Sequence, residues 1–225
     1  MHIELPKIRL QSPKEFLKHY LMIVLSILTA LGLEAWIEHA HHTDAAETAS
    51  RQMSAELREN LAETRDSLRQ NDQSLQAVDQ LDAILTADLR NGAPVAVINQ
   101  HLQAHRSGFR LRINWPTLPT SAWDVAVTNH SVSWIAPGPL KKYFAAYAAQ
   151  HDAASWVQHD SLLSLDIRQQ INFSTDLDMN RPVDPQAFQY TLRQMKITLT
   201  SMNNNLRALE KHLADAMPGD DHAAG

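Results

Sequence analysis

Hydrophobic and polar positions divide the chain into an apolar segment near its start and a longer region with helical periodicity. No formal charge occurs from Tyr20 to Leu33. A helix from Tyr20 to Ile37 is ~27 Å long, just enough to cross a ~30 Å hydrocarbon core. The pattern predicts a short tail over 1–15, a transmembrane anchor over 16–38 and a water-soluble domain after it.

Two other interpretations of the apolar segment stay open. A cleaved signal peptide also contains an uncharged run of this length. No small-x-small cleavage site followed by a plausible break is present, and Leu33-Glu34-Ala35 has a large residue at its first position. A buried helix of a soluble protein is the third interpretation, and it does not explain the asymmetry of charge around the segment.

Charge on the two sides of the segment predicts its orientation. Lys7, Arg9, Lys14 and Lys18 precede the apolar run, whereas the first Lys or Arg after it is Arg51, which lies among acidic residues. The positive-inside rule therefore predicts a cytoplasmic N-terminus. In a Gram-negative cell this arrangement is a single-pass inner-membrane protein with most of its chain in the periplasm.

Two stretches carry a clear helical stripe of apolar residues. The first follows the anchor and is expected to continue it to about Leu89, with Asn71 and Asp82 as polar interruptions. Its stripe is Leu57, Leu61, Thr64, Leu68, Leu75, Val78 and Leu85. The second begins at the N-cap Asp184 and the first helical residue Pro185. Its stripe is Phe188, Leu192, Met195, Leu199, Met202, Leu206, Leu209 and Leu213.

The middle of the chain contains shorter elements. Pro94 is expected to open a short helix, and alternating apolar and polar residues within 106–120 predict an extended strap over the domain. A capping box from Ser121 to Asp124 predicts a helix to about Thr128, and Pro139 is expected to start a third long helix. Apolar Trp134 and Ile135 are expected to fill the core between them. The predicted fold is all-α: the transmembrane helix continues into an antiparallel bundle of three long helices over 39–217, with a disordered tail over 218–225.

Composition excludes several function classes. The chain has 225 residues, no cysteine, 6 glycines and a formal net charge of -5. The absence of cysteine excludes disulfides, cysteine-ligated metals and a thiol nucleophile. The acidic balance gives no reason to expect nucleic acid, and no glycine-rich phosphate loop or nucleophile elbow is present. We therefore expect neither an enzyme nor a bound cofactor.

Few residues suggest specific chemistry. His39, His41 and His42 form one cluster, His101 and His105 form a helical pair, and either set is a candidate for weak metal binding. His151 is expected to be partly buried on the third long helix. Arg106, Arg110 and Arg112 concentrate positive charge on the strap as a candidate contact for an anion or an acidic partner.

Within the anchor, Ser26, Ala30 and Glu34 share one helical face because they are four residues apart. Small residues permit close approach of helices in lipid, and an ionisable group in a membrane helix is a candidate functional site. The hypothesis is that this face packs against another membrane helix. The simpler alternative is that Glu34 lies at the outer interface and reaches water.

Three features together resemble a family of uncharacterised bacterial single-pass membrane proteins. They are the anchor pattern Ile-Leu-x-Ala-Leu-x-x-x-x-Trp over 27–36, the stretch 57–61, and the residues from Ser121-Ala122-Trp123-Asp124 to Tyr147. The resemblance covers most of 16–150 and implies an anchor that leads into a helical extracytoplasmic domain. This chain has Glu34 where the family more often has Asn or Gln. No activity is implied by the resemblance.

These observations favour a non-enzymatic accessory or scaffold protein. Its partners are expected to be the bilayer and either another membrane protein or further copies of itself, contacted through the anchor and the exposed flanks of the two long striped helices. The alternative is a periplasmic sensory or ligand-binding helical module, because membrane-proximal helical bundles also serve that purpose.

Overall fold

The computed structural model describes residues 13–109, 113–156 and 167–217, and these residues contain helices and no strand. The all-α fold class is therefore confirmed. The elements are α1 (Pro13–Arg90), α2 (Val95–Ala104), the 3-10 helix η1 (Arg106–Phe109), α3 (Ser121–Thr128), the 3-10 helix η2 (Ser131–Trp134), α4 (Pro137–Trp156), α5 (Ile167–Asp178) and α6 (Pro185–Ala216). The predicted disordered tail over 218–225 and part of the predicted strap lie outside the described residues.

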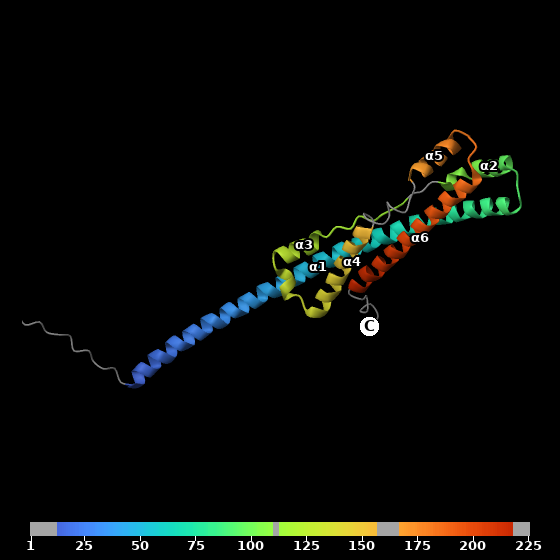
Figure 1. The fold of residues 1–225 in the computed structure, drawn as a ribbon. Coiled ribbons are helices and arrows are strands. Elements are labelled where there is room, and N and C mark those ends of the chain that lie inside the picture. The colour runs from blue at the N-terminus through green and yellow to red at the C-terminus, as the bar shows by residue number, and fades with distance from the viewer. Residues whose placement is uncertain (1–12, 110–112, 157–166, 218–225) are drawn as a thin grey trace, which may run out of the picture.

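Helix α1 is one continuous helix of 78 residues, about 117 Å long at 1.5 Å per residue. It can be this long because no proline interrupts it after Pro13 and Gly32 is its only glycine. It ends where Gly92 adopts a left-handed φ of 65°, which glycine tolerates without steric cost. Figure 1 shows its N-terminal part projecting alone from a folded body that surrounds its C-terminal part. The predicted continuity of the apolar segment with the striped helix that follows it is confirmed.

Helix α6 runs antiparallel to the C-terminal part of α1. Arg65 pairs with Glu210, Asp72 with Arg207, and Asp79 with Lys196, so that α6 numbers fall as α1 numbers rise. The predicted α6 stripe is buried throughout, from Phe188 to Leu213. Asp184 caps the helix, because its Oδ1 accepts hydrogen bonds from the Gln186 and Ala187 N–H groups at 2.8 and 2.9 Å.

The buried side chains form two clusters along this helix pair. The proximal unit, nearer the projecting part of α1, combines α1 with α3, α4 and the end of α6. Its buried members include Met53, Leu57, Leu61, Tyr143, Ala146, Tyr147, Met202, Leu206, Leu209 and Leu213. The distal unit combines α1 with α2, η1, α5 and the start of α6. Its buried members include Val78, Leu81, Leu85, Ile98, Leu102, Phe109, Phe173, Phe188, Leu192 and Met195.

A polar layer separates the two units. Asn71 is the one buried α1 side chain between Leu68 and Val78, and its exposed fraction is 0%. Opposite it on α6 lies the equally buried Asn203, whose amide donates to Asp72 Oδ1 at 2.8 Å. The sequence identified Asn71 as an interruption of the stripe, and the structure shows that this interruption lies inside the protein.

Several boundaries differ from the sequence-based expectations. Residues 106–109 form the 3-10 turn η1 instead of an extended strap, since the Gly108 N–H donates to the His105 carbonyl at 2.9 Å. From Ile113 to Thr120 the chain has no regular secondary structure and lies along α1. The N-cap residue of α3 is Thr120 and not Ser121; its hydroxyl donates to Asp124 Oδ2 at 2.9 Å and makes no capping bond to the backbone. Helix α4 begins at Pro137 and not at Pro139.

Candidate functional site

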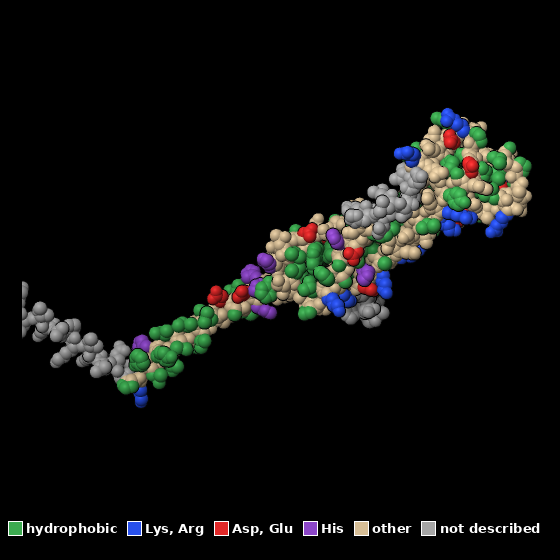
Figure 2. All heavy atoms as spheres, viewed as in Figure 1, with side chains coloured by type: hydrophobic (Ala, Val, Ile, Leu, Met, Phe, Trp, Pro, Cys, Tyr) green, Lys and Arg blue, Asp and Glu red, His purple; other side chains and the backbone are tan. Residues whose placement is uncertain are grey.

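The apolar part of α1 is the most exposed apolar surface near the N-terminus. One window of this helix has a mean hydropathy of 1.9 with 0% of its residues buried, and it is long and apolar enough to cross a membrane. Figure 2 shows this part as a column of hydrophobic side chains separate from the folded body. The described part of the chain buries none of these side chains.

The predicted packing face on this part of α1 is open. Ser26, Ala30 and Glu34 are all exposed, and the Ser26 hydroxyl donates to the Met22 carbonyl at 2.8 Å. That bond satisfies the hydroxyl within the helix, as is common for serine in membrane helices. The face is therefore free of contacts with the described part of the chain.

The structure places the candidate histidines apart from one another. His39 and His41 are exposed, while His42 stacks on Trp134 with ring centroids 3.5 Å apart. Among the described residues, no group of three or more His, Asp or Glu side chains is arranged to hold a metal ion.

The second histidine pair is engaged in local contacts. His101 Nδ1 lies 2.8 Å from Asp88 Oδ2, and His105 Nδ1 lies 2.9 Å from the His101 carbonyl. Both contacts use Nδ1, so a metal ion bound through the two Nε2 atoms would leave them in place and would still need further ligands. His151, predicted to be partly buried, is exposed, because the buried position on that turn of α4 is taken by Gln150.

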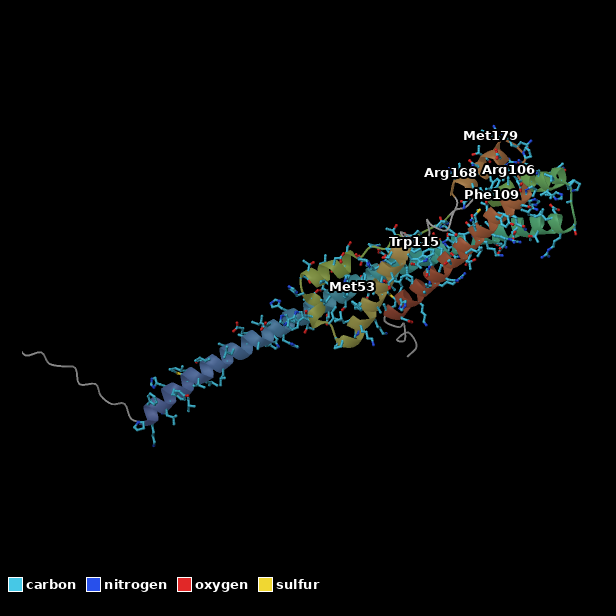
Figure 3. All side chains as sticks on the ribbon, in the orientation of Figure 1. Met53, Arg106, Phe109, Trp115, Arg168 and Met179 are labelled. Atoms are coloured by element: carbon cyan, nitrogen blue, oxygen red, sulfur yellow. The ribbon has the colours of Figure 1, made fainter. Side chains whose placement is uncertain are left out.

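The arginine cluster is described only in part. Arg106 is exposed at the distal end and lines a polar hollow of about 340 Å³ with Gln103, Ser174 and Asp178. In Figure 3, Arg106 and Arg168 are both labelled at the distal end of the molecule. Arg110 and Arg112 lie outside the described residues. Asp178 in the same hollow supplies a negative charge, so the hollow is not a purely cationic site.

Polar side chains of α1 bind the backbone of the segment that links the two units. Asn71 donates to the Asn114 carbonyl at 2.9 Å and accepts from its N–H at 2.8 Å. Further along, Glu63 accepts from the Thr117 N–H and Asn60 donates to the Pro119 carbonyl. A backbone without its own ladder of hydrogen bonds thus obtains partners from one helix. We call the α1 side chains Glu56, Asn60, Glu63 and Asn71 the polar ladder.

Glu56 ends the polar ladder and connects it to α4. Its carboxylate accepts from the Ala122 N–H at 3.0 Å and from the Tyr147 hydroxyl at 2.8 Å. Burial, followed by the hydrogen bond to Glu56, raises the pKa of Tyr147 well above its ordinary value. The hydroxyl therefore stays protonated and acts as a structural donor. Tyr143 makes a similar link, with its hydroxyl 2.8 Å from Ser54 Oγ.

The exposed apolar side chains of the folded body include two groups on its helices. The α3–α4 patch consists of Trp123, Val127 and Phe144; Phe144 is 61% exposed and its ring centroid lies 6.2 Å from that of Trp123. Figure 2 shows hydrophobic side chains gathered over α3 and α4. The α6 flank consists of Tyr190 and Ile197, which are 69% and 67% exposed and share a helical face.

The α6 flank lies on one of the striped helices, and a partner surface there stays a prediction. The α3–α4 patch was missed by sequence reasoning, because α3 and α4 meet only in the folded chain. Its only signal was the presence of aromatic residues in both segments, such as Trp123 and Phe144.

The chain matches no protein-family model, no curated protein and no solved structure. The resemblance to uncharacterised single-pass membrane proteins therefore remains a prediction from the sequence. The function has to be argued from the geometry above.

Proposed function

We propose that this chain is a non-enzymatic, single-pass inner-membrane protein whose periplasmic helical domain assembles with another membrane protein or with copies of itself. The observation that carries the proposal is the division within α1. Its first part presents apolar side chains to the surroundings on every side, and its second part forms the central helix of a folded body. A continuous helix without proline joins the two, so a partner bound in the membrane is mechanically connected to the domain.

The orientation is part of the proposal. Lys14 and Lys18 lie at the start of α1, whereas Glu34, Glu38, Asp44 and Glu47 follow the apolar part. This asymmetry supports a cytoplasmic N-terminus and a periplasmic domain. The antiparallel bundle of three long helices also belongs to the proposal, with α4 as the third member beside α1 and α6.

Two surfaces suit protein partners for different reasons. The α3–α4 patch and the α6 flank hold large apolar side chains that a monomer leaves in water, a feature typical of interaction sites. The Ser26, Ala30 and Glu34 face lies in the part of α1 that we assign to the membrane, where small residues permit close helix packing.

Co-purification from native membranes in mild detergent tests this function. The full chain is compared with a variant of the α3–α4 patch (Val127→Ser with Phe144→Ser) and a variant of the α6 flank (Tyr190→Ser with Ile197→Ser). We expect a stoichiometric complex that one variant loses and the other keeps. Recovery of all three proteins as lone monomers would contradict the proposal.

The membrane face has its own test. The chain contains no cysteine, so Ser26→Cys and Ala30→Cys each introduce a single thiol. Crosslinking through these thiols in native membranes is expected at these positions and not at Leu28→Cys, which lies on another face of the helix. Equal crosslinking at all three positions would show random collision instead of a defined contact.

A second candidate function is a ligand-binding or sensory module. A largely apolar hollow of about 410 Å³ lies at the start of α4, lined by Ser50, Gly138, Pro139, Lys142, Tyr143, Ala216 and Met217. Its volume is within the range of small-molecule sites. Native mass spectrometry of the purified chain separates the two candidates. A small molecule bound to an otherwise lone chain favours the sensor, whereas a protein partner favours the scaffold.

A further inference from the structure

The turn between α3 and α4 is a firmly held part of the proximal unit. Ile135 is buried, and Ser131 is joined to the preceding chain by two bonds: its N–H donates to Asn129 Oδ1 at 3.0 Å and its hydroxyl to the Ala126 carbonyl at 3.3 Å. His130 begins the turn in a left-handed conformation with φ of 63°. These contacts fix η2 relative to the end of α3, and η2 also packs against α1.

Trp134 at the end of η2 is exposed beside His42 of α1. The sequence predicted that it fills the core with Ile135, yet 51% of its surface is exposed. Its ring lies parallel to the imidazole of His42, with an angle of 9° between the ring planes. A large aromatic side chain is thus presented at the end of the folded body that adjoins the apolar part of α1.

The position of Trp134 along α1 can be estimated from the helix itself. His42 follows Ile37, the last apolar residue of the predicted anchor, by a rise of about 8 Å. Each headgroup layer of a bilayer is about 5–8 Å thick. Because side chains on a helix tilt toward its N-terminus, the imidazole and the indole stacked on it lie closer to the anchor than this rise indicates.

We propose that η2 is a second membrane-contacting element, in which Trp134, held against His42, inserts its indole into the lipid headgroup layer. Tryptophan favours this layer because its ring is apolar and its N–H can still reach water or a headgroup. The contact lies to one side of α1, so it fixes the direction in which the helix tilts and the side of the domain that faces the bilayer. This inference rests on the proposed membrane insertion of α1.

Tryptophan quenching by brominated lipid tests the contact. The full chain is reconstituted in phosphatidylcholine nanodiscs as three single-tryptophan variants, which retain Trp36, Trp134 or Trp115. Lipids brominated near the headgroup are expected to quench Trp36 most, Trp134 clearly and Trp115 least, since Trp115 lies on the linking segment far along α1 (Figure 3).

The outcomes separate this inference from the proposed function. Quenching of Trp36 without any excess at Trp134 over Trp115 would overturn the second contact and leave the anchor intact. No quenching of Trp36 would overturn the anchor and, with it, the contact.

A cysteine-based measurement covers the case in which the tryptophan replacements prevent folding. Exposed Ser133 on η2 is replaced by cysteine and carries a nitroxide label, with exposed Gln52→Cys on α1 as the matched control. We expect the label at position 133 to be more accessible to lipid-soluble oxygen, relative to a water-soluble nickel complex, than the label at position 52. Equal ratios at the two positions would overturn the proposal.

Discussion

Residues 16–37 and 49–85 belong to the same helix, yet only the second group buries side chains in the described structure. From Tyr20 to Leu33 the first group carries no charge and has apolar side chains around the whole circumference. The second has a stripe of apolar residues on one side and charged residues on the others. A helix that is apolar all round suits lipid, and a striped helix suits a protein core. The two groups share the same helical backbone. They differ in their side chains, which are exposed in the first group and partly buried in the second.

The largest expected effect is a loss of stability when a leucine of the second group is truncated, compared with a leucine of the first group. Leu57 is 0% exposed and Leu28 is 60% exposed. Leu57→Ala is expected to lower the free energy of unfolding of the domain by about 3 kcal/mol, through lost burial and an unfilled cavity. Leu28→Ala is the matched control, with no expected effect on urea unfolding in detergent. A similar loss for both would show that Leu28 also packs against protein.

The polar layer is the next place to test, because it joins the two units. Asn71→Ala leaves the Asn114 N–H and carbonyl without their partner and is expected to cost about 2 kcal/mol. The half-buried Asn99 makes the same pair of bonds to Val183 in the distal unit. Asn99→Ala is expected to cost about 1 kcal/mol, since water can replace part of the contact. Equal free energies of unfolding for Asn71→Ala and the wild type would show that the polar layer does not stabilise the fold.

A smaller effect is expected at the proximal end of the polar ladder. Tyr147→Phe removes the hydrogen bond to Glu56 and is expected to cost about 1 kcal/mol near neutral pH. The raised pKa of Tyr147 means that the folded state favours the neutral phenol, whereas tyrosine in the unfolded chain ionises above about pH 10. This contribution is complete below that pH and is lost as the pH rises further.

Urea unfolding at about pH 9 and about pH 11 measures the pH effect. The wild type is expected to lose more stability over this interval than Tyr147→Phe does. An identical loss in the two proteins would assign the alkaline sensitivity to other groups.

The smallest effect concerns the ion pairs between α1 and α6. Lys196 Nζ lies 2.6 Å from Asp79 Oδ1, and the hydrogen bond to Asp79 raises the pKa of Lys196. Both side chains are largely open to water, being 46% and 43% exposed. Lys196→Met is therefore expected to change stability by less than about 0.5 kcal/mol, and by less still in high salt. A loss comparable to that of Leu57→Ala would mean that charge pairing, and not burial, holds α6 on α1.

The striped helices could be predicted from the sequence because their information is local. The stripe from Phe188 to Leu213 repeats without a fault, and Asp184 with Pro185 marks its start. Both features were confirmed. The continuity of α1 was also predictable, because glycine and proline are almost absent from it.

The candidate contacts were harder to predict because they depend on distant residues. Asn71 was visible as an interruption, but its partner Asn114 lies in a segment with no regular structure. Trp134 was expected in the core because it is large and apolar, and only the placement of η2 beside His42 makes it exposed. The alanine-rich helix α4 has only a weak periodicity of apolar residues. The sequence therefore predicted partial burial of His151, whereas its neighbour Gln150 is the buried residue.

The division of α1 between membrane and protein is tested most directly by single-cysteine labelling in intact spheroplasts with a membrane-impermeant maleimide. The cysteine-free chain permits Lys14→Cys, Leu28→Cys and Ala55→Cys to be compared in an otherwise unchanged protein. We expect labelling at position 55 in intact spheroplasts, at position 14 only after lysis, and at position 28 in neither state. Labelling at position 28 equal to that at position 55, or recovery of a shortened chain without residues 16–38, would contradict the account.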